Sequence, residues 1–444
     1  MSHTIPEAFI ARVNNYLGDD ASALLQSLKT SAPTSIRLNS KKKIDIETNE
    51  KVAWCESGIY LQERPKFTLD PLFQAGCYYV QEAASMFLGF ALKQTVNQED
   101  SITALDLCAA PGGKSTHILA SISDDSTLIS NEIIPNRNKI LRENLTKWGY
   151  ANSIVTQNDA SQFAASEMQF DVIVVDAPCS GEGLFRKDPA AIDEWSVDNV
   201  NLCSARQSNI LDEIKECLKE NGLLFYSTCT YEPSENDDQI ERLLASNEFE
   251  IIKLKDIPES ITLTKYGYQF YPHKTKGEGF YLAVLKKITE SPTSKDKAKS
   301  KSSKSTTDQY LSAYLKNPGK FTSMQFKEFV LAIPHHTNSI FQQLNSKLHV
   351  KSAGLTLGTL KGKDFIPAHE LALSIDINPE IKRIELSKED ALIYMKCDTI
   401  KVDSDYKGWA VVTYQNQGLG WIKLVPGRVN NYFPKELRIK MDIK

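Results

Sequence analysis

Two cysteines stand directly after apolar runs of strand length, and their chemistry is the most conspicuous in the chain. The run from Phe170 to Val175 is followed by Asp176-Ala177-Pro178-Cys179, and the run that begins at Leu223 ends at Cys229. Buried parallel strands present reactive groups at their carboxyl ends, along one rim of a sheet. We therefore expect Cys179, Cys229 and Asp176 to meet at one sheet edge.

A glycine-rich turn forms a second feature with chemical potential. It reads Asp106-Leu107-Cys108-Ala109-Ala110-Pro111-Gly112-Gly113-Lys114-Ser115 and lies between a strand-like run and a helical stretch. One interpretation is a phosphate loop, G-x-x-x-x-G-K-[ST], although Cys108 replaces the first glycine and its Cβ would obstruct amides that turn toward a phosphate. The other is a turn over the amino-acid and ribose ends of S-adenosylmethionine, where Gly112 and Gly113 allow close backbone approach.

Acidic residues at successive strand ends favour the second interpretation. Glu132 follows the next strand, about 20 residues past the glycines, where a carboxylate can bind a ribose diol. Asp159 follows the third strand and would accept from the exocyclic amine of adenine. Each acid taken singly could instead cap a helix, but the series suits a neutral sugar and base and would repel a triphosphate. A dinucleotide-binding site is weaker still, because G-x-G-x-x-G is absent.

A pair of cysteines beside such a cofactor has a chemical use. Carbon 5 of cytosine is too weak a nucleophile to attack a sulfonium methyl group, so a thiolate must first add to carbon 6. The proton on carbon 5 must leave afterwards, which gives a second thiol or base a role. Asp176 would hydrogen-bond or donate a proton at the N3 edge of the base. Residue chemistry alone does not show which cysteine is the nucleophile and which acts later. A cysteine taken singly is more often a small buried hydrophobic residue than a catalytic one.

The pattern around these residues predicts an α/β fold with a doubly wound parallel sheet, because apolar strand-length runs alternate with amphipathic helical stretches from about 76 to 288. The expected strands are 102–107, 127–130, 153–156, 170–175 and 222–227, and the expected helices are 114–121, 136–148 and 200–219. A terminal pair, 249–254 and 279–287, would close the sheet as an antiparallel edge.

Composition indicates a globular protein of several domains. The 444 residues are 41% hydrophobic and 24% charged, and no apolar stretch approaches the length of a membrane span, so we expect a cytoplasmic protein with no membrane association. The eight cysteines show neither C-x-x-C nor Cys/His ligand spacing, so we predict no metal site. The formal net charge is −4, yet residues 407 to 444 hold seven Lys/Arg against two acids, a local excess suited to phosphate binding.

The flanking regions predict further modules. We place an N-terminal α/β module at 1–75, with helices at 7–17 and 21–28, and the catalytic domain at 76–288. A Ser/Lys-rich linker follows at 289–307, then an intermediate region at 308–385 with a helix at 323–331 and β-like segments near 354–360. A C-terminal module at 386–444 would contain a helix at 388–395 and a small antiparallel barrel or sheet.

At the cysteine motifs the chain resembles the NOP/Sun-type RNA cytosine-5 methyltransferase family. The resemblance rests on Asp106 to Ser115, Asp176 to Gly183, Tyr226 to Thr230 and Gly277 to Phe280, and also on Tyr78 to Ser85. It covers about 34 to 287. The tail from Gly427 to Pro434 resembles the bacterial small-subunit ribosomal RNA branch of that family. That resemblance implies a Rossmann-like class I methyltransferase domain and a PUA-like RNA-binding β-barrel module at the C-terminus.

The resemblance also implies roles for individual residues. Cys229 would be the nucleophile, and Cys179 would assist release of the methylated product. S-adenosylmethionine would be contacted by Cys108, Ala109, Ala110, Pro111, Gly112, Gly113, Lys114, Glu132, Asp159 and Asp176. The partner would be RNA, in particular small-subunit rRNA or the small ribosomal subunit, and we expect a monomer.

Other residues keep two interpretations each. Arg186 and Lys187, with Phe185 beside them, would grip an RNA backbone and stack on a base, or form a solvated loop. Arg37 would be a solvated edge charge or an RNA contact, and His335-His336 would be surface or capping residues. Two other functions stay open: a phosphate-loop ATPase with Asp176 as its metal-holding acid, and a catalytically silent RNA-binding factor of ribosome assembly.

Overall fold

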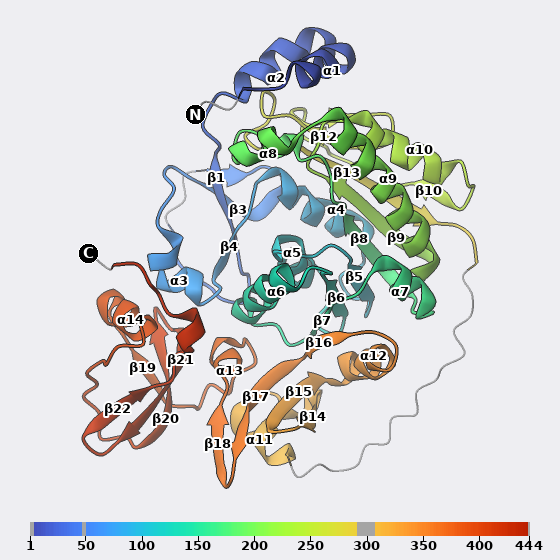
Figure 1. Ribbon diagram of the computed structural model, residues 1–444. Coiled ribbons are helices and arrows are strands. Elements are labelled where there is room, and N and C mark those ends of the chain that lie inside the picture. The colour runs from blue at the N-terminus through green and yellow to red at the C-terminus, as the bar shows by residue number, and fades with distance from the viewer. Residues whose placement is uncertain (1–3, 47–49, 291–306, 443–444) are drawn as a thin grey trace.

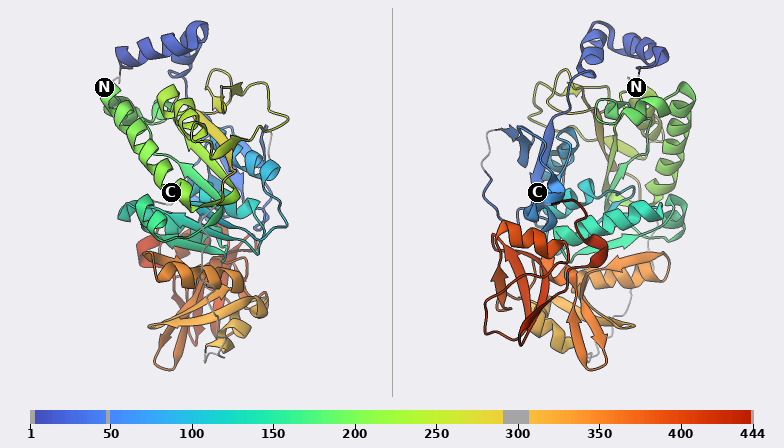
Figure 2. Two further views of the ribbon diagram at one scale, coloured as in Figure 1. Left: turned by 90° about the vertical axis from the view of Figure 1, so that its right-hand side faces the viewer. Right: turned by 60° about the vertical axis from the view of Figure 1, so that its left-hand side comes forward.

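The computed structural model describes residues 4–46, 50–290 and 307–442. The predicted Ser/Lys-rich linker therefore falls almost wholly outside the described residues. The N-terminal helices lie at one end of the molecule, the predicted catalytic region in the middle, and the C-terminal half at the other end (Figures 1 and 2). Among the described residues no helix is both long and apolar enough to cross a membrane.

The elements of the N-terminal half alternate as the apolar periodicity predicts. The first of them are α1 (Glu7–Leu17), α2 (Ala21–Ser27), β1 (Thr34–Leu38), β2 (Lys51–Val52), β3 (Cys55–Leu61), α3 (Pro71–Gln74), β4 (Tyr78–Val80) and α4 (Phe87–Thr95). The central elements are β5 (Thr103–Asp106), α5 (Gly113–Ser121), β6 (Thr127–Asn131), α6 (Pro135–Trp148), β7 (Ser153–Thr156), α7 (Ala160–Ala165), β8 (Phe170–Asp176), α8 (Pro189–Glu194), α9 (Val197–Ile214) and β9 (Leu218–Thr228). The region ends with α10 (Asp237–Leu244), β10 (Phe249–Ile251), β11 (Thr262–Leu263), β12 (Tyr268–Phe270) and β13 (Phe280–Lys287).

The central sheet is doubly wound, as predicted. Its strand order in the described chain is β11-β12-β13-β9-β8-β5-β6-β7-β16, with β10 paired to β13. Strands β5 to β9 are mutually parallel, while β13 pairs antiparallel with β9; the predicted terminal pair is antiparallel, but β13 is not the edge, because β12 and β11 lie beyond it. The chain winds outward from β5 to β7 and then returns to β8, so the order reverses between β5 and β8. Ligands of such sheets bind beyond the carboxyl ends of the strands at this point.

Two apolar layers cover the faces of this sheet. One core holds Leu92 of α4, Ile118 of α5 and Leu141 of α6. The opposite core contains side chains of α7, α9 and α10, among them Phe163 and Leu211. Because both faces are buried, the parallel strands read as continuous apolar runs rather than as alternating ones.

The N-terminal sheet, with the order β2-β3-β1-β4, lies between two other parts of the molecule. Ile36 and Ile59 of this sheet share a core with the C-terminal module. Val52 and Trp54, on the other side, belong to a core of the central sheet. Strand β4 lies beyond residue 75, where we expected the first module to end, yet it pairs with β1.

The C-terminal half contains two further sheets. Its elements are α11 (Asp308–Tyr314), β14 (Phe321–Phe326), β15 (Phe329–Pro334), α12 (His335–Asn345), β16 (Val350–Ala353), β17 (Leu355–Lys361), β18 (Asp364–Pro367), α13 (His369–Leu373), β19 (Arg383–Glu385), α14 (Lys388–Met395), β20 (Gly408–Tyr414), β21 (Gln417–Val425) and β22 (Arg428–Asn431). Strands β20 to β22 form the predicted antiparallel sheet, to which β19 adds in parallel. Helix α14 spans the predicted residues.

The helix predicted at 323–331 is wrong, because this segment is the hairpin of β14 and β15. Lys327 has φ +54°, a left-handed conformation typical of a tight turn, and it reverses the chain between Phe326 and Phe329. Val330 is buried in the core beneath the hairpin. Short apolar runs on either side of a turn can imitate helical spacing, and here pairing of β15 with β17 decides the outcome.

One strand of this half joins the central sheet. β16 pairs antiparallel with β7, with Ala353 opposite Ile154, and Gly354 N donates to Ser153 O at 3.0 Å. Helix α12 also packs against the central domain, since its Leu344 is buried in the core of the central sheet. The intermediate region is therefore continuous with the central sheet through backbone hydrogen bonds.

We predict that Gly76→Ala destabilises the protein strongly. Gly76 has φ +70°, and a Cβ there would collide with the carbonyl oxygen of Lys147 on α6. Because backbone must shift where the N-terminal module meets the central domain, the free energy of unfolding should fall by about 2 kcal/mol or more. Gly362→Ala is the matched control, since Gly362 has φ +63° but open space around it, and should cost about 1 kcal/mol. Equal losses in chemical denaturation would contradict the steric argument.

Candidate active site

The structure brings the two predicted cysteines together. Cys179 follows β8 by three residues and Cys229 directly follows β9, and these strands are parallel with Asp176 opposite Ser227. The Sγ atoms of Cys179 and Cys229 are 3.2 Å apart, and the backbone N–H of Cys229 donates to the Cys179 sulfur at 3.3 Å. Both side chains are partly exposed, so a ligand can reach them.

A buried carboxylate holds the Cys179 loop. Glu235 accepts from the backbone N–H of Ser180 at 3.0 Å and from its hydroxyl at 2.6 Å. Gln207 on α9 donates to the same carboxylate and to the carbonyl of Pro178. The hydrogen bond to Cys229, followed by burial, raises the pKa of the Cys179 thiol well above its usual range. Cys179 therefore holds its proton at neutral pH.

Asp176 is fixed by neighbours on both sides. Its Oδ2 lies 2.8 Å from Lys114 Nζ, and its Oδ1 accepts from the Ser227 hydroxyl at 2.8 Å. Burial opposes the charge of Lys114, but attraction to Asp176, to Asp106 and to Cys229 outweighs it and leaves the pKa of Lys114 raised. The ammonium group also lies over the ring of Phe280 at 5.1 Å. Lys114 is thus a largely buried cation, with its side chain 13% exposed, engaged by an acid and close to Cys229.

Three successive carbonyl oxygens of the glycine-rich turn, those of Ala110, Pro111 and Gly112, accept side-chain hydrogen bonds. Arg137 donates to Ala110 O at 2.8 Å, and Asn144 donates to Pro111 O at 2.8 Å, both from α6. Thr116 hydrogen-bonds to Gly112 O through its N–H and hydroxyl, and Gly112 has φ +113°, which favours glycine. The turn is therefore rigid, and the first N–H groups of α5 lack intrahelical acceptors.

Three acids converge at the carboxyl ends of β5, β6 and β8. Burial, together with the charges of Asp176 and Glu132, raises the pKa of Asp106 to about 7. The Ser115 hydroxyl donates to Asp106 Oδ2, whereas Oδ1 is buried with no hydrogen-bond partner among the described residues. Glu132 is also buried, with Arg137 Nη1 3.1 Å from its Oε2. Burial and these same acids raise the pKa of the Cys108 thiol, which lies among them.

Asp159 occupies a different setting. Its side chain accepts from Ser161 N, and together with Gln162 it forms a capping box at the start of α7. The sequence left this capping role open as the alternative to adenine binding. The carboxylate is exposed, so the cap leaves it accessible from solvent.

Sequence reasoning missed Glu182, which lies in the Gly-Glu-Gly segment after Cys179. Its carboxylate is 1% exposed and accepts from Trp195 Nε1, Tyr231 N and the Thr230 hydroxyl, each at 3.0 Å. Burial and the nearby charge of Glu232 raise its pKa to about 8. An acid between two glycines directly after the Pro-Cys motif was the available signal, because glycines there allow the chain to fold tightly around a buried group.

Three residues considered for RNA contact make contacts within the protein. Arg186 forms a buried ion pair with Glu278 at 3.0 Å and donates to Gly277 O. Phe185 is buried, with its ring centroid 5.0 Å from that of Phe9 on α1. The interpretation as a solvated loop is therefore wrong for these two residues, and Phe185 is not free to stack on a base, whereas contact of Arg186 with RNA stays a prediction. Arg37 is wholly buried, so it is neither a solvated charge nor a surface contact.

Of the two expectations for the histidine pair, a surface position is confirmed for His335, which is exposed, and capping is wrong, because α12 has no side-chain cap hydrogen bond. His336 Nε2 lies 2.6 Å from the Thr127 hydroxyl, and His335 Nδ1 lies 2.9 Å from the Thr322 hydroxyl. Within the described ranges no group of His, Cys, Asp or Glu side chains has the arrangement of a metal site.

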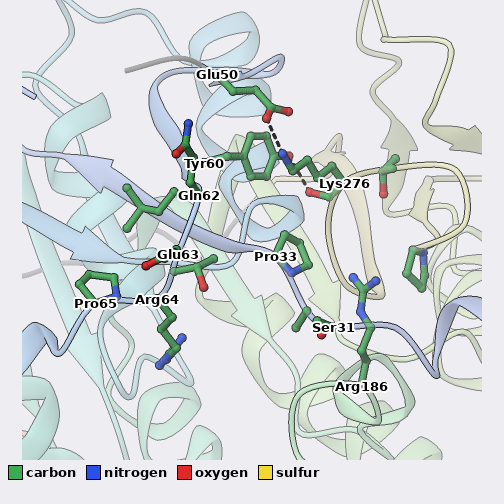
Figure 3. Close-up of a pocket in the computed structure, with 15 residues that line it drawn as sticks. Ser31, Pro33, Glu50, Tyr60, Gln62, Glu63, Arg64, Pro65, Arg186 and Lys276 are labelled. Atoms are coloured by element: carbon green, nitrogen blue, oxygen red, sulfur yellow. Dashed lines mark hydrogen bonds and ion pairs between the residues drawn. The ribbon is translucent and has the colours of Figure 1, made fainter. Parts of the chain in front are cut away.

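A groove of about 1170 Å³ lies beside this region, between the N-terminal module and the central domain (Figure 3). Its walls include Tyr60, Arg64 and Arg186, and Lys276 lies over the ring of Tyr60 at 4.6 Å. Lys276 pairs with Glu50 across the groove, as Figure 3 shows, and Arg186 pairs with Glu278. The groove is therefore mixed in charge and contains none of the predicted catalytic or cofactor-binding residues.

Comparison with known proteins matches all three parts of the chain. The description "16S rRNA methyltransferase RsmB/F" matches residues 93–286, "N-terminal domain of 16S rRNA methyltransferase RsmF" matches 5–83, and "Methyltransferase RsmF PUA domain" matches 381–439. The ribosomal RNA small subunit methyltransferase F of Aliivibrio fischeri is 30% identical in an alignment 471 positions long, which covers 98% of this chain and 97% of the relative. The chain belongs to the 16S rRNA methyltransferase RsmB/F family.

Other members and solved structures agree with this membership. The protein of the same name from Shewanella loihica is 28% identical, covering 87% of this chain and 83% of its own. A methyltransferase homologue from Pyrococcus horikoshii is 26% identical, with a TM-score of 0.56 over 64% of this chain and 95% of that one. NSun6 from the same organism, at 19% identity and a TM-score of 0.57, covers 65% of this chain and 100% of its own and shows the shared fold. The predicted family, the Rossmann-like methyltransferase fold and the methyltransferase class are thereby confirmed.

We predict that Glu182 makes wild-type stability fall with rising pH. The pKa of its carboxyl is about 8 in the folded protein against an ordinary 4.5. Between these values the unfolded chain releases the proton while the folded protein keeps it, so unfolding is increasingly favoured as pH rises. The unfolding free energy of wild type relative to Glu182→Gln should therefore decrease from pH 5 to pH 8 and level off on either side. Glu220→Gln, which removes an exposed carboxylate, is the control, and a pH-independent difference for Glu182→Gln would refute the burial argument.

Proposed function

We propose that the protein methylates carbon 5 of a cytosine in small-subunit ribosomal RNA through a covalent bond from Cys229. The observation that carries the proposal is the pair of thiols 3.2 Å apart at the carboxyl ends of β8 and β9, beside the acid-lined turn of β5. A single base held against this edge would contact the nucleophile and a second proton-carrying thiol at once. Because such a base cannot stay stacked in a duplex, the target cytosine is flipped or unpaired.

The residues around the turn fit S-adenosylmethionine. That molecule carries a sulfonium and an ammonium group, and Asp106, Glu132 and Asp176 surround the turn, with Lys114 as the largely buried cation that offsets them. The unpartnered Asp106 Oδ1 is an acceptor that suits a ligand amine or hydroxyl. We propose that residues Cys108 to Lys114 hold the amino-acid and ribose portions, Glu132 the ribose diol and Asp159 the adenine amine. When bound, the cofactor supplies an electrophilic methyl group to carbon 5.

The protein's own groups carry the remaining steps. Cys229 adds as a thiolate to carbon 6, which forms the C–S bond and shifts the electrons of the C5–C6 double bond toward carbon 5 and the ring. The Lys114 ammonium group, whose pKa is raised by Asp176, Asp106 and Cys229, stays charged near the reacting sulfur. Asp176 orients the base at its N3 edge and holds Lys114 in place. After methylation the proton on carbon 5 passes to a base, and the C–S bond breaks to release Cys229.

Cys179 acts in that last stage. Its sulfur touches that of Cys229, and its raised pKa makes its thiolate a strong base once formed. It passes its own proton to the departing Cys229 sulfur, 3.2 Å away, and takes the carbon 5 proton in exchange, so the C–S bond breaks, the product is released and both cysteines end as thiols.

The modules around the site support an RNA substrate. We propose an N-terminal module that runs through β4 (Tyr78–Val80), a catalytic domain that follows it and extends to 288, and a C-terminal RNA-binding module at 386–444, acting as a monomer in the cytoplasm. The local excess of Lys and Arg after residue 407 is suited to the RNA backbone. Unlike a phosphate-loop lysine, Lys114 is engaged by Asp176. Tight binding of magnesium-ATP with no binding of S-adenosylmethionine would contradict the methyltransferase proposal and favour the phosphate-loop ATPase.

We predict opposite behaviour for the two cysteine variants. Cys179→Ala should accumulate a covalent RNA–protein adduct on a denaturing gel, because methylation proceeds while release fails. Cys229→Ala should form no adduct and lose methyl transfer by at least about a thousandfold, since the nucleophile is gone. Cys397→Ala, distant in the C-terminal module, should behave as wild type. An adduct in Cys229→Ala but not in Cys179→Ala would reverse the assignment.

The ribosomal target is tested separately. Bisulfite sequencing of small-subunit rRNA from a strain lacking this gene should lose 5-methylcytosine at the target site, and the wild-type gene should restore it. Transfer to naked rRNA and to isolated small subunits identifies the substrate form. RNA binding without methyl transfer to any ribosomal RNA would support the silent assembly factor.

A further inference from the structure

Arg37 is a buried cation of the N-terminal module that no step of the proposed reaction uses. It lies on β1 opposite Tyr79 of β4, and none of its surface is exposed. The titratable groups that interact with it in the described residues include Cys55, Tyr79, Tyr150 and His117, none of which is a carboxylate. Burying an arginine without an acidic partner has a large desolvation free energy, which other contacts of the guanidinium group must offset.

Several of those contacts are made to the glycine-rich turn and to the start of α5. Nη2 donates to the Thr116 hydroxyl at 2.7 Å and lies 3.5 Å from Gly113 O, both in the first turn of α5. Nε donates to Gln81 Oε1 at 2.7 Å, which fixes the plane of the guanidinium group. The ring of Trp148, the last residue of α6, lies 4.6 Å from Cζ. A planar fork with several donors can make all these contacts at once, which an ammonium group cannot.

The contact with Thr116 reaches the backbone of the turn itself. The Thr116 hydroxyl accepts from Arg37 and lies 2.8 Å from Gly112 O, so it relays the contact to the residue with φ +113°. The carbonyls of Ala110 and Pro111 in the same turn are held by α6 within the catalytic domain. Arg37 is thus the contribution of the N-terminal module to the same rigid turn.

A positive group beside the first turn of a helix also meets the positive end of the helix dipole. Burial lowers the pKa of Arg37 to about 10, so the guanidinium group stays charged at neutral pH. Arg37 and the start of α5 together make the potential at the turn more positive. This favours a ligand with a carboxylate or electron-rich oxygens facing α5, while the acids at the strand ends face its cationic groups.

We propose that Arg37 is a positioning residue for cofactor binding, through which the N-terminal module holds the first turn of α5 in the shape that binds S-adenosylmethionine. This inference rests on the proposed function for the identity of the ligand. It assigns the N-terminal module a part in cofactor affinity as well as any part in RNA binding.

The test uses the full chain and three variants. Arg37→Met removes the donors while keeping an apolar stem, Arg37→Lys keeps the charge and one donor group, and Thr116→Val removes only the hydroxyl relay. In isothermal titration with S-adenosylmethionine, well below each melting temperature, Arg37→Met and Thr116→Val should bind about tenfold or more weakly than wild type. Arg37→Lys should recover part of the loss. In steady-state assays the KM for the cofactor should rise while kcat and the KM for RNA stay near wild type.

Arg12→Met is the matched control, because Arg12 is also an N-terminal arginine that contacts the catalytic domain, through Glu232 at 2.5 Å, and makes no contact with the turn. It should lower stability and leave cofactor affinity unchanged. Equal loss of affinity in Arg12→Met, or unchanged affinity in both Arg37→Met and Thr116→Val, would show that Arg37 is only structural. If Arg37→Met does not fold, Thr116→Val still decides the question.

Hydrogen exchange of the protein without ligand separates this inference from the proposed function. Amides of residues 108–116 should exchange faster in Arg37→Met and Thr116→Val than in wild type or Arg12→Met. If wild type does not bind S-adenosylmethionine, the proposed function fails, yet this exchange pattern still reports on the turn. Unchanged exchange in both turn variants would overturn the inference.

Discussion

The parallel register of β8 and β9 is the constraint on which the site depends. Val174 lies opposite Phe225 and Asp176 opposite Ser227, so both chains leave the sheet at one level. Cys229 directly follows β9. Cys179 stands three residues after β8, and the hydrogen bonds from Ser180 to Glu235 hold its loop so that its sulfur lies next to that of Cys229. A shift of one residue in either strand would turn its side chains to the other face and separate the thiols. The apolar runs that specify both strands therefore also specify the distance between the two sulfurs.

The sequence predicted the parts of this architecture that repeat a simple period. Strands β5 to β9 and helices α5, α6 and α14 lie close to their expected residues, because continuous apolar runs and amphipathic spacing are local signals. The hairpin of β14 and β15 was predicted as a helix, since its turn residues, Lys327 and Glu328, carry no glycine or proline signal and its pairing with β17 comes from residues further along the chain.

The fates of individual charges were harder to predict than the elements. Arg37 and Arg186 stand in polar, strand-like or loop contexts that suggest exposure, yet each is buried by residues more than 75 positions away in sequence. The acids show both outcomes: Asp106 and Glu132 gather at the turn, while Asp159 caps a helix. Residue type states what a side chain can do, but only the packing of distant segments decides whether it faces water, a ligand or another side chain.

Strand β16 gives the C-terminal half a fixed geometry relative to the thiols. Because β16 continues the sheet that begins with the catalytic strands, the segment after the Ser/Lys run is attached by a ladder of backbone hydrogen bonds and not only by its tether. The C-terminal module in turn shares a core with the N-terminal sheet, so it is held from two sides. If that module binds RNA, the distance along the RNA between the bound segment and the base at the two thiols would be fixed. Such an enzyme would choose its cytosine by distance from a held structural landmark, and the bases beside the target would need to carry little of the specificity.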